Sequence, residues 1–154
     1  MTLMNPRTAY REDTVRGAHP VRLVVLLYEQ IIEDVRQAAL AIEQNQVERR
    51  THKINHAISV IAYLESSLNH QAGAQVAGNL ENFYRQLRRN LVQAHVSASP
   101  AILSQQITDL LTLRAAWSQV ESEVKVAEAA ARNVKPVPAA AASDAARGRS
   151  KWQG

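Results

Sequence analysis

The absence of proline between Pro20 and Pro100 limits the possible fold more than any other feature of this sequence. The interval is rich in Leu, Ile, Ala, Gln, Glu and Arg, which are mostly good helix formers. Proline suits the first turn of a helix, and both prolines stand where a helical pattern begins. With only five Gly and five Pro in 154 residues, a turn-rich all-β fold is not indicated. The chain is therefore predicted to be all-α.

Apolar residues recur every three or four positions in four segments, which places each set on one helix face. We expect helices at about residues 20–44, 47–69, 74–97 and 100–131. The breaks between them are short, and short connections make consecutive helices antiparallel neighbours. The predicted fold is an antiparallel up-down four-helix bundle over residues 20–132, with an N-terminal extension (1–19) and a C-terminal tail (133–154).

Each predicted helix has one apolar stripe that we assign to the core. The stripes are Leu23, Leu27, Ile31, Val35, Ala38 and Ile42; Ile54, Ala57 or Ile58, Ile61, Leu64 and Leu68; Val76, Leu80, Phe83, Leu87, Leu91 and Ala94; and Leu103, Ile107, Leu110, Leu113, Trp117, Val120 and Val124.

Charge is unevenly distributed along the chain. The tail holds four basic residues and one acidic residue, so it carries most of the formal net charge of +4. It is rich in Ala and Pro and has no apolar period, so we predict that it is disordered. The sequence has no Cys, and its longest apolar run, Leu23 to Tyr28, is far too short to cross a bilayer. No signal peptide is indicated. These features predict a cytoplasmic protein that does not insert into membranes.

Two polar groups suggest chemistry of their own. His52 and His56 lie one helical turn apart, with Glu48 one turn earlier, which is a possible metal-binding face. The zinc-protease and di-iron spacings are both missing, so a solvated face is the favoured interpretation. Arg85, together with Arg88 and Arg89, forms a basic group opposite an apolar stripe. It offers an alternative function as a basic helical nucleic-acid-binding module, although aromatic residues for base stacking are not interleaved with it.

The chain also has more apolar residues than a four-helix bundle needs, which is about three positions in seven. Beside the predicted stripe of the first helix runs a second one, formed by Val21, Val25, Tyr28 and Ile32. One explanation is a wide core that is partly filled by residues 1–19. The other is a groove that receives an amphipathic partner helix. The two are compatible, because Tyr10 and Val15 can cover such a groove until a partner displaces them.

Several groups of residues follow one another in a recognisable order. They are Ala9-Tyr10 and Val15; Ala18-His19-Pro20-Val21-Arg22-Leu23-Val24-Val25-Leu26-Leu27-Tyr28-Glu29; Lys53 to Ile61 with Leu64, Leu68 and Asn69; Gly73, Val76-Ala77 and Asn79-Leu80; Phe83-Tyr84 with Arg88 to Ala94; and Leu110, Leu113-Arg114 and Ala116-Trp117. In order and spacing they resemble the flagellar export chaperone FliS family, over about residues 9–117.

This resemblance implies a bacterial cytoplasmic bundle that binds the C-terminal segment of flagellin. It implies that the protein prevents premature polymerisation and helps to present flagellin to the membrane protein of the flagellar type III export gate. It also implies no enzymatic activity, no cofactor or metal, and no small-molecule substrate. The residues from which we expect the partner contacts to come are Tyr10, Val15, Val25, Tyr28, Ile32, Val60, Tyr63, Leu64, Tyr84, Leu91, Leu113 and Trp117.

Overall fold

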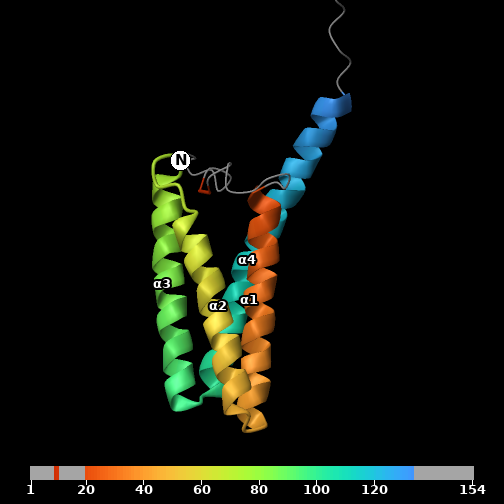
Figure 1. Cartoon of the computed structure of the whole chain (residues 1–154). Coiled ribbons are helices and arrows are strands. Elements are labelled where there is room, and N and C mark those ends of the chain that lie inside the picture. Colours follow the sequence, from red (N-terminus) through yellow and green to blue (C-terminus); the bar gives the residue numbers. More distant parts are fainter. Residues whose placement is uncertain (1–8, 11–19, 134–154) are drawn as a thin grey trace, which may run out of the picture. The chain divides into compact units, whose positions relative to one another are not determined.

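The computed structural model describes residues 9–10 and 20–133, and this part of the chain is almost entirely helical (Figure 1). The helices are α1 (Pro20–Glu43), α2 (Val47–Ser66), α3 (Ala74–Ser97) and α4 (Pro100–Asn133). Over the same residues the only strand-like pairing is an isolated antiparallel bridge between Tyr10 and Leu68. The predicted all-α four-helix bundle is confirmed.

The chain divides into two compact units, Met1–Ser122 and Glu123–Gly154. The bundle of the first unit comprises α1, α2, α3 and the part of α4 up to Ser122. In the second unit, residues 123–133 are the last turns of α4, where Val126 is 67% exposed. The predicted groove cover at Val15 lies outside the described residues. So do residues 134–154, which were predicted to form a disordered tail.

The turns between helices use residues that tolerate unusual backbone angles or provide local hydrogen bonds. Asn45 follows α1 with φ of 55°, in the left-handed region that Asn tolerates better than most residues. Ala98 closes α3 with φ of 49°, and its N–H donates to the last carbonyls of that helix. Helix α2 ends at Ser66, three residues before the predicted end. Beyond this end the N–H of Asn69 donates to the Ala9 carbonyl at 2.6 Å.

Polar contacts between helices define the order of the helices around the bundle. They are Asp34–His56 between α1 and α2, Glu65–Arg88 between α2 and α3, Asn90–Gln106 between α3 and α4, and Glu29–Arg114 and Arg22–Glu121 between α1 and α4. Each helix therefore neighbours the next one, and α4 neighbours α1. In such a ring the boundary between α1 and α2 and the boundary between α3 and α4 lie on opposite sides.

The predicted core stripes are confirmed for much of the bundle, but the assignment in α1 was wrong in part. Leu23, Leu27 and Ile42 are only partly buried, whereas the second stripe lies fully inside. Val76, Phe83, Ile107, Leu113 and Val120 are likewise only partly buried, and of the two alternatives in α2 it is Ala57, not Ile58, that is buried. The α1 residues in the centre of the core are Val21, Val24, Val25, Tyr28, Ile31, Ile32, Val35, Ala38 and Ala41. The predicted stripe of α1 therefore lies in the core at Ile31, Val35 and Ala38 but not at its two ends.

Candidate functional site: two apolar grooves beside a buried tyrosine cluster

A shallow apolar groove follows the boundary between α1 and α2. It has a volume of about 350 Å³ and is lined by Leu23 and Leu27 from α1 and by Ser59, Val60 and Tyr63 from α2. Tyr63 is 40% exposed, so its ring adds open apolar surface to this groove. The groove exists because α1 turns its other apolar stripe into the core and leaves its leucines at the boundary.

A second groove lies on the opposite boundary, between α3 and α4. It has a volume of about 440 Å³ and is lined by Phe83, Asp109, Thr112, Leu113 and Ala116. Its polar lining residues, Asp109 and Thr112, come from α4, whereas Phe83 comes from α3. Two open apolar grooves on opposite sides suit a long partner segment better than a compact ligand.

Three tyrosines meet inside the bundle next to the second groove. The Tyr84 hydroxyl lies 2.5 Å from the Tyr28 hydroxyl and also hydrogen-bonds the hydroxyl of Tyr10. The ring of Tyr10 meets Trp117 edge to face at 5.5 Å, and Phe83 meets Tyr84 in the same way at 5.8 Å. Phe83 therefore connects the groove wall with the tyrosine cluster.

Burial dominates the ionisation of this cluster. Desolvation raises the pKa of the hydroxyls of Tyr10, Tyr28 and Tyr84 well above their ordinary value. For Tyr28, hydrogen bonds from Tyr84, Tyr10 and the Trp117 indole partly offset that rise in pKa. All three tyrosines are therefore neutral at physiological pH, and each hydroxyl can donate one hydrogen bond.

The N-terminal residues Ala9 and Tyr10 dock at the same end of the bundle. Tyr10 is only 5% exposed, and its backbone pairs with Leu68 just after α2. The predicted cover residue thus lies against the aromatic cluster. Whether a partner displaces it remains a prediction.

The twelve predicted contact residues fall into three groups. Val60, Tyr63 and Leu113 line the grooves, and Val15 is not described. The remaining residues are buried in the free chain: Tyr10, Val25, Tyr28, Ile32, Leu64, Tyr84, Leu91 and Trp117. The sequence analysis missed Leu23, Leu27 and Phe83 as groove residues because it assigned them to the core. The sequence did contain a signal for them, because the chain has more apolar residues than the core of a four-helix bundle needs.

A family model described as "Flagellar protein FliS" matches residues 3–124 of the chain. The chain belongs to the FliS family. The flagellar secretion chaperone FliS of Bacillus subtilis (strain 168) is 31% identical over 126 residues, covering 81% of this chain and 93% of that protein. Flagellar secretion chaperone FliSB of Pseudomonas aeruginosa is 31% identical over 109 residues, covering 71% of this chain and 86% of that protein. FliS of Salmonella typhimurium is 25% identical over 118 residues, covering 76% and 87% respectively.

Membership in the FliS family makes this chain a flagellar secretion chaperone. None of the described helices combines the length and hydropathy that a bilayer-spanning segment requires. A flagellar secretion chaperone has a secreted client, and the two grooves are the candidate surfaces for it.

The metal-binding alternative at His52 and His56 gains no support in the part of the chain that the structure describes. There, no three side chains of the His, Asp and Glu types are grouped closely enough to hold a metal ion. His56 is instead engaged with the buried carboxylate of Asp34, 2.5 Å from its Nδ1 atom.

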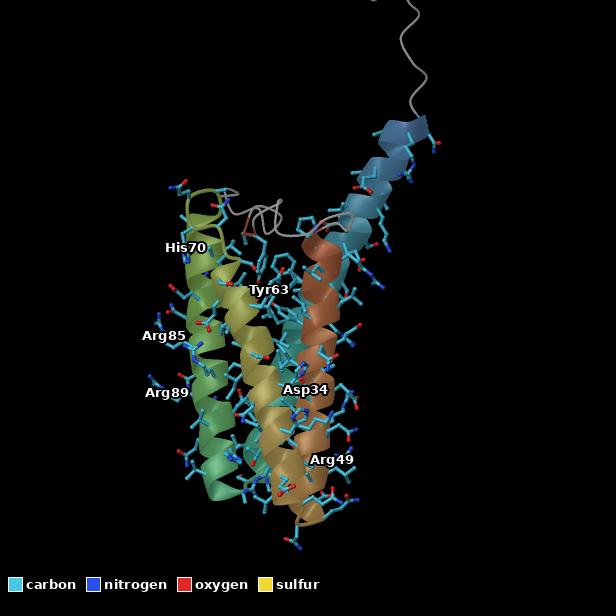
Figure 2. All side chains as sticks on the ribbon, viewed as in Figure 1. Asp34, Arg49, Tyr63, His70, Arg85 and Arg89 are labelled. Atoms are coloured by element: carbon cyan, nitrogen blue, oxygen red, sulfur yellow. The ribbon has the colours of Figure 1, made fainter. Side chains whose placement is uncertain are left out.

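The arginine group of α3 is partly neutralised by neighbouring carboxylates. Arg88 pairs with Glu65, and Arg85 lies 3.9 Å from Glu81. Figure 2 shows Arg85 and Arg89 on the outer side of α3. Only Arg89 of the three has no ion pair within the described residues. This leaves a weaker positive surface than the sequence indicates.

Proposed function

We propose that this FliS-family chain binds the C-terminal segment of flagellin in the bacterial cytoplasm and holds it apart from other flagellin molecules until export. The observation that carries the proposal is the pair of open apolar grooves, which leave Tyr63 exposed and the leucines that line them only partly buried. Family membership supports a client that is secreted by the flagellar apparatus.

The proposed mechanism is burial of an apolar helix face. A flagellin C-terminus packs against other helices in the filament, so its apolar residues associate before export unless they are covered. A helix that lies in a groove places residues i, i+3, i+4 and i+7 against it. We expect Leu23, Leu27 and Tyr63 to contact such residues on one side of the bundle, and Phe83 and Leu113 to do so on the other.

Binding a disordered segment costs ordering free energy of roughly 2–5 kcal/mol or more. Two grooves on opposite sides provide an interface long enough to offset that cost if one segment occupies both. No nucleotide or cofactor is needed to release the segment from the chaperone, because the export apparatus pulls the segment away. We therefore expect no catalytic activity, and we expect the loaded complex to be the form that the membrane protein of the export gate recognises.

Isothermal titration calorimetry of the full chain with a peptide of the flagellin C-terminal segment from the same organism tests this proposal. We expect tight binding that persists at high salt, with a negative heat-capacity change, because apolar burial dominates. Tyr63→Ala should weaken binding about tenfold or more, as an aromatic anchor at an interface does. Val96→Ala is the matched control, because Val96 is 77% exposed on α3 but does not line either groove.

Absence of peptide binding by the folded protein would contradict the proposal. The alternative, a basic nucleic-acid-binding module, predicts affinity that falls steeply with salt and depends on Arg89. The same titration with an oligonucleotide at two salt concentrations separates the two functions.

A further inference from the structure

The face of α2 that meets α1 changes its chemistry halfway along the helix. Its residues are Arg49, Lys53, His56, Val60 and Tyr63, which follow one another at steps of three or four positions and so share one side. The last two line the apolar groove. The first three are basic. Figure 2 shows Tyr63, Asp34 and Arg49 in succession along the boundary between α1 and α2.

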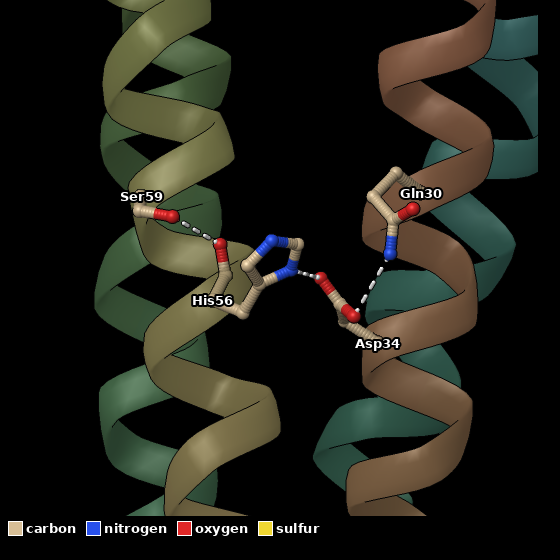
Figure 3. Close-up of polar contacts among 4 residues, drawn as sticks. All are labelled: Gln30, Asp34, His56 and Ser59. Carbon is tan, nitrogen blue, oxygen red and sulfur yellow. Dashed lines mark hydrogen bonds and ion pairs between the residues drawn. The ribbon is translucent and has the colours of Figure 1, made fainter.

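A polar cluster marks the point where the apolar part ends. The Asp34 side chain is 2% exposed, and its carboxylate accepts a hydrogen bond from Gln30 Nε2 at 3.0 Å. Its other oxygen lies 2.5 Å from His56 Nδ1 (Figure 3). A buried carboxylate needs such partners, and in return it fixes the orientation of the imidazole ring.

The geometry leaves His56 one free nitrogen. Its side chain is 47% exposed, and because Nδ1 faces Asp34, Nε2 is the atom available to a partner. Ser59 does not compete for it, because its hydroxyl donates to the backbone carbonyl of His56 at 2.7 Å (Figure 3). His56 thus presents a polar atom at the end of the apolar groove.

The two cations beyond His56 have no carboxylate partner among the described residues. Arg49 donates to the side-chain oxygen of Gln37, and Lys53 has no ion pair there. At other helix boundaries Arg22, Arg88 and Arg114 pair with carboxylates, whereas Arg50 hydrogen-bonds His95. Cations without a neutralising carboxylate can form charge-assisted hydrogen bonds with an acidic partner.

Three acidic residues lie near this surface, and among the described residues none of them forms an ion pair with Arg49 or Lys53. Asp34 is buried and satisfied, and Glu33 accepts a hydrogen bond from Gln37. Glu48 lies in the first turn of α2, where the helix dipole adds partial positive charge.

We propose that the boundary between α1 and α2 binds a client segment that is apolar in one part and acidic in the next, and that His56, Lys53 and Arg49 contact the acidic part. The inference rests on the proposed function and specifies the chemistry of the client. His56 lies four residues before Val60, which is about 6 Å along α2. A helical client lying along this boundary therefore has its first carboxylate about one turn beyond its last apolar contact.

Such charge pairing gives the client a single register. A purely apolar groove allows an amphipathic helix to slide by one turn with little loss of buried surface. A shifted client instead places an apolar residue against His56 and leaves its carboxylate in the apolar groove, which is unfavourable. His56 is thus a specificity-determining residue, and Asp34 is a positioning residue that acts through it.

Double-mutant cycles test the proposal. The probe is the flagellin C-terminal peptide from the same organism, in forms where each Asp or Glu is replaced singly by Asn or Gln. The full chain carries His56→Gln, Lys53→Gln or Arg49→Gln, and the matched control is Arg89→Gln, another arginine without an ion pair. We expect His56→Gln to lower the affinity about three- to tenfold, and Lys53→Gln or Arg49→Gln about two- to fivefold.

The distinguishing result is non-additivity. The effect of His56→Gln should disappear when one particular peptide carboxylate is absent, and the effect of Arg89→Gln should not depend on any carboxylate. Asp34→Asn should weaken binding in the wild-type background but have no further effect in the His56→Gln background, which a general loss of structure would not produce. Circular dichroism of each variant establishes that the bundle is intact.

Two outcomes overturn the proposal, and they differ in what else they overturn. If the wild-type chain does not bind the peptide at all, both the proposed function and this inference are wrong. If the peptide binds and Tyr63→Ala weakens it, but the basic residues show no coupling to any carboxylate, the function stands and the inference alone is wrong.

Discussion

Tyr84 on α3 joins two hydroxyls that come from distant parts of the chain. Its Oη lies 2.5 Å from that of Tyr28 on α1 and also hydrogen-bonds Tyr10, which precedes the bundle. The three rings fill the end of the core where the N-terminal residues dock. This relationship makes Tyr84 the centre of a buried polar network, and such networks are costly to leave half satisfied.

Replacement of Tyr84 by Phe should therefore destabilise the bundle by about 1–3 kcal/mol, because the hydroxyls of Tyr10 and Tyr28 each lose a hydrogen-bond partner while they stay buried. Urea unfolding followed by circular dichroism measures the change. Tyr63→Phe is the control, because Tyr63 is 40% exposed and should show almost no effect. Equal stability of Tyr84→Phe and the wild type would mean that water replaces the lost hydroxyl.

The same cluster predicts how stability depends on alkaline pH. The pKa of each buried tyrosine is raised in the folded state, so the unfolded chain loses these protons first as pH rises. Below about pH 10 the contribution of these tyrosines to the free energy of unfolding should be constant. Above about pH 10 it should fall by about 1 kcal/mol per pH unit for each tyrosine. Urea midpoints between pH 8 and 11.5 test this, and Tyr84→Phe should show a shallower decline. A flat profile would contradict the buried, neutral assignment.

Ala98 offers a stabilising substitution at the end of α3. Its φ of 49° lies in the left-handed region, which costs an L-residue roughly 1 kcal/mol and costs glycine nothing. Ala98→Gly should raise the free energy of unfolding by about 1 kcal/mol, and thermal unfolding measures it. Ala101→Gly, in the first turn of α4, is the matched control and should lower stability. If Ala98→Gly also lowers stability, the left-handed cap does not form in solution.

Gly78 within α3 offers the opposite change. A methyl group added there meets no atom within 4 Å, so alanine fits without strain. Gly78→Ala should stabilise the protein by about 0.5–1 kcal/mol, because alanine loses less backbone freedom on folding. Binding of the flagellin peptide should not change, because Gly78 does not line either groove. Weaker peptide binding by this variant would show that a partner approaches the α3 backbone here.

The sequence was sufficient to predict the helices and their antiparallel order, because the spacing of apolar residues and the positions of the prolines both depend on local structure. It did not distinguish the two apolar stripes of α1. From Val21 to Tyr28 only Arg22 is polar, so the pattern allows either stripe to face the core. The choice depends on tertiary contacts such as Tyr28 with Tyr84, 56 positions apart in sequence.

The polar pair of Asp34 and His56 was missed for a related reason. On its own helix His56 lies away from the apolar stripe, so a solvated face was the natural interpretation. Its partner comes from α1, 22 positions earlier. Spacing within one helix reports which residues share a face, but it does not report which residue of the neighbouring helix lies opposite.

The last prediction concerns Tyr10 as a displaceable cover. Tyr10 contacts Trp117, and Phe83 links the groove between α3 and α4 to Tyr84, so the client and Tyr10 compete if the client reaches this cluster. Tyr10→Ala should then leave the helix content unchanged and tighten peptide binding, because no internal contact has to be broken first. Circular dichroism and calorimetry on the same sample measure both effects. Loss of helix content would show that Tyr10 is an essential part of the core, and unchanged affinity in a folded variant would show that the client does not reach it.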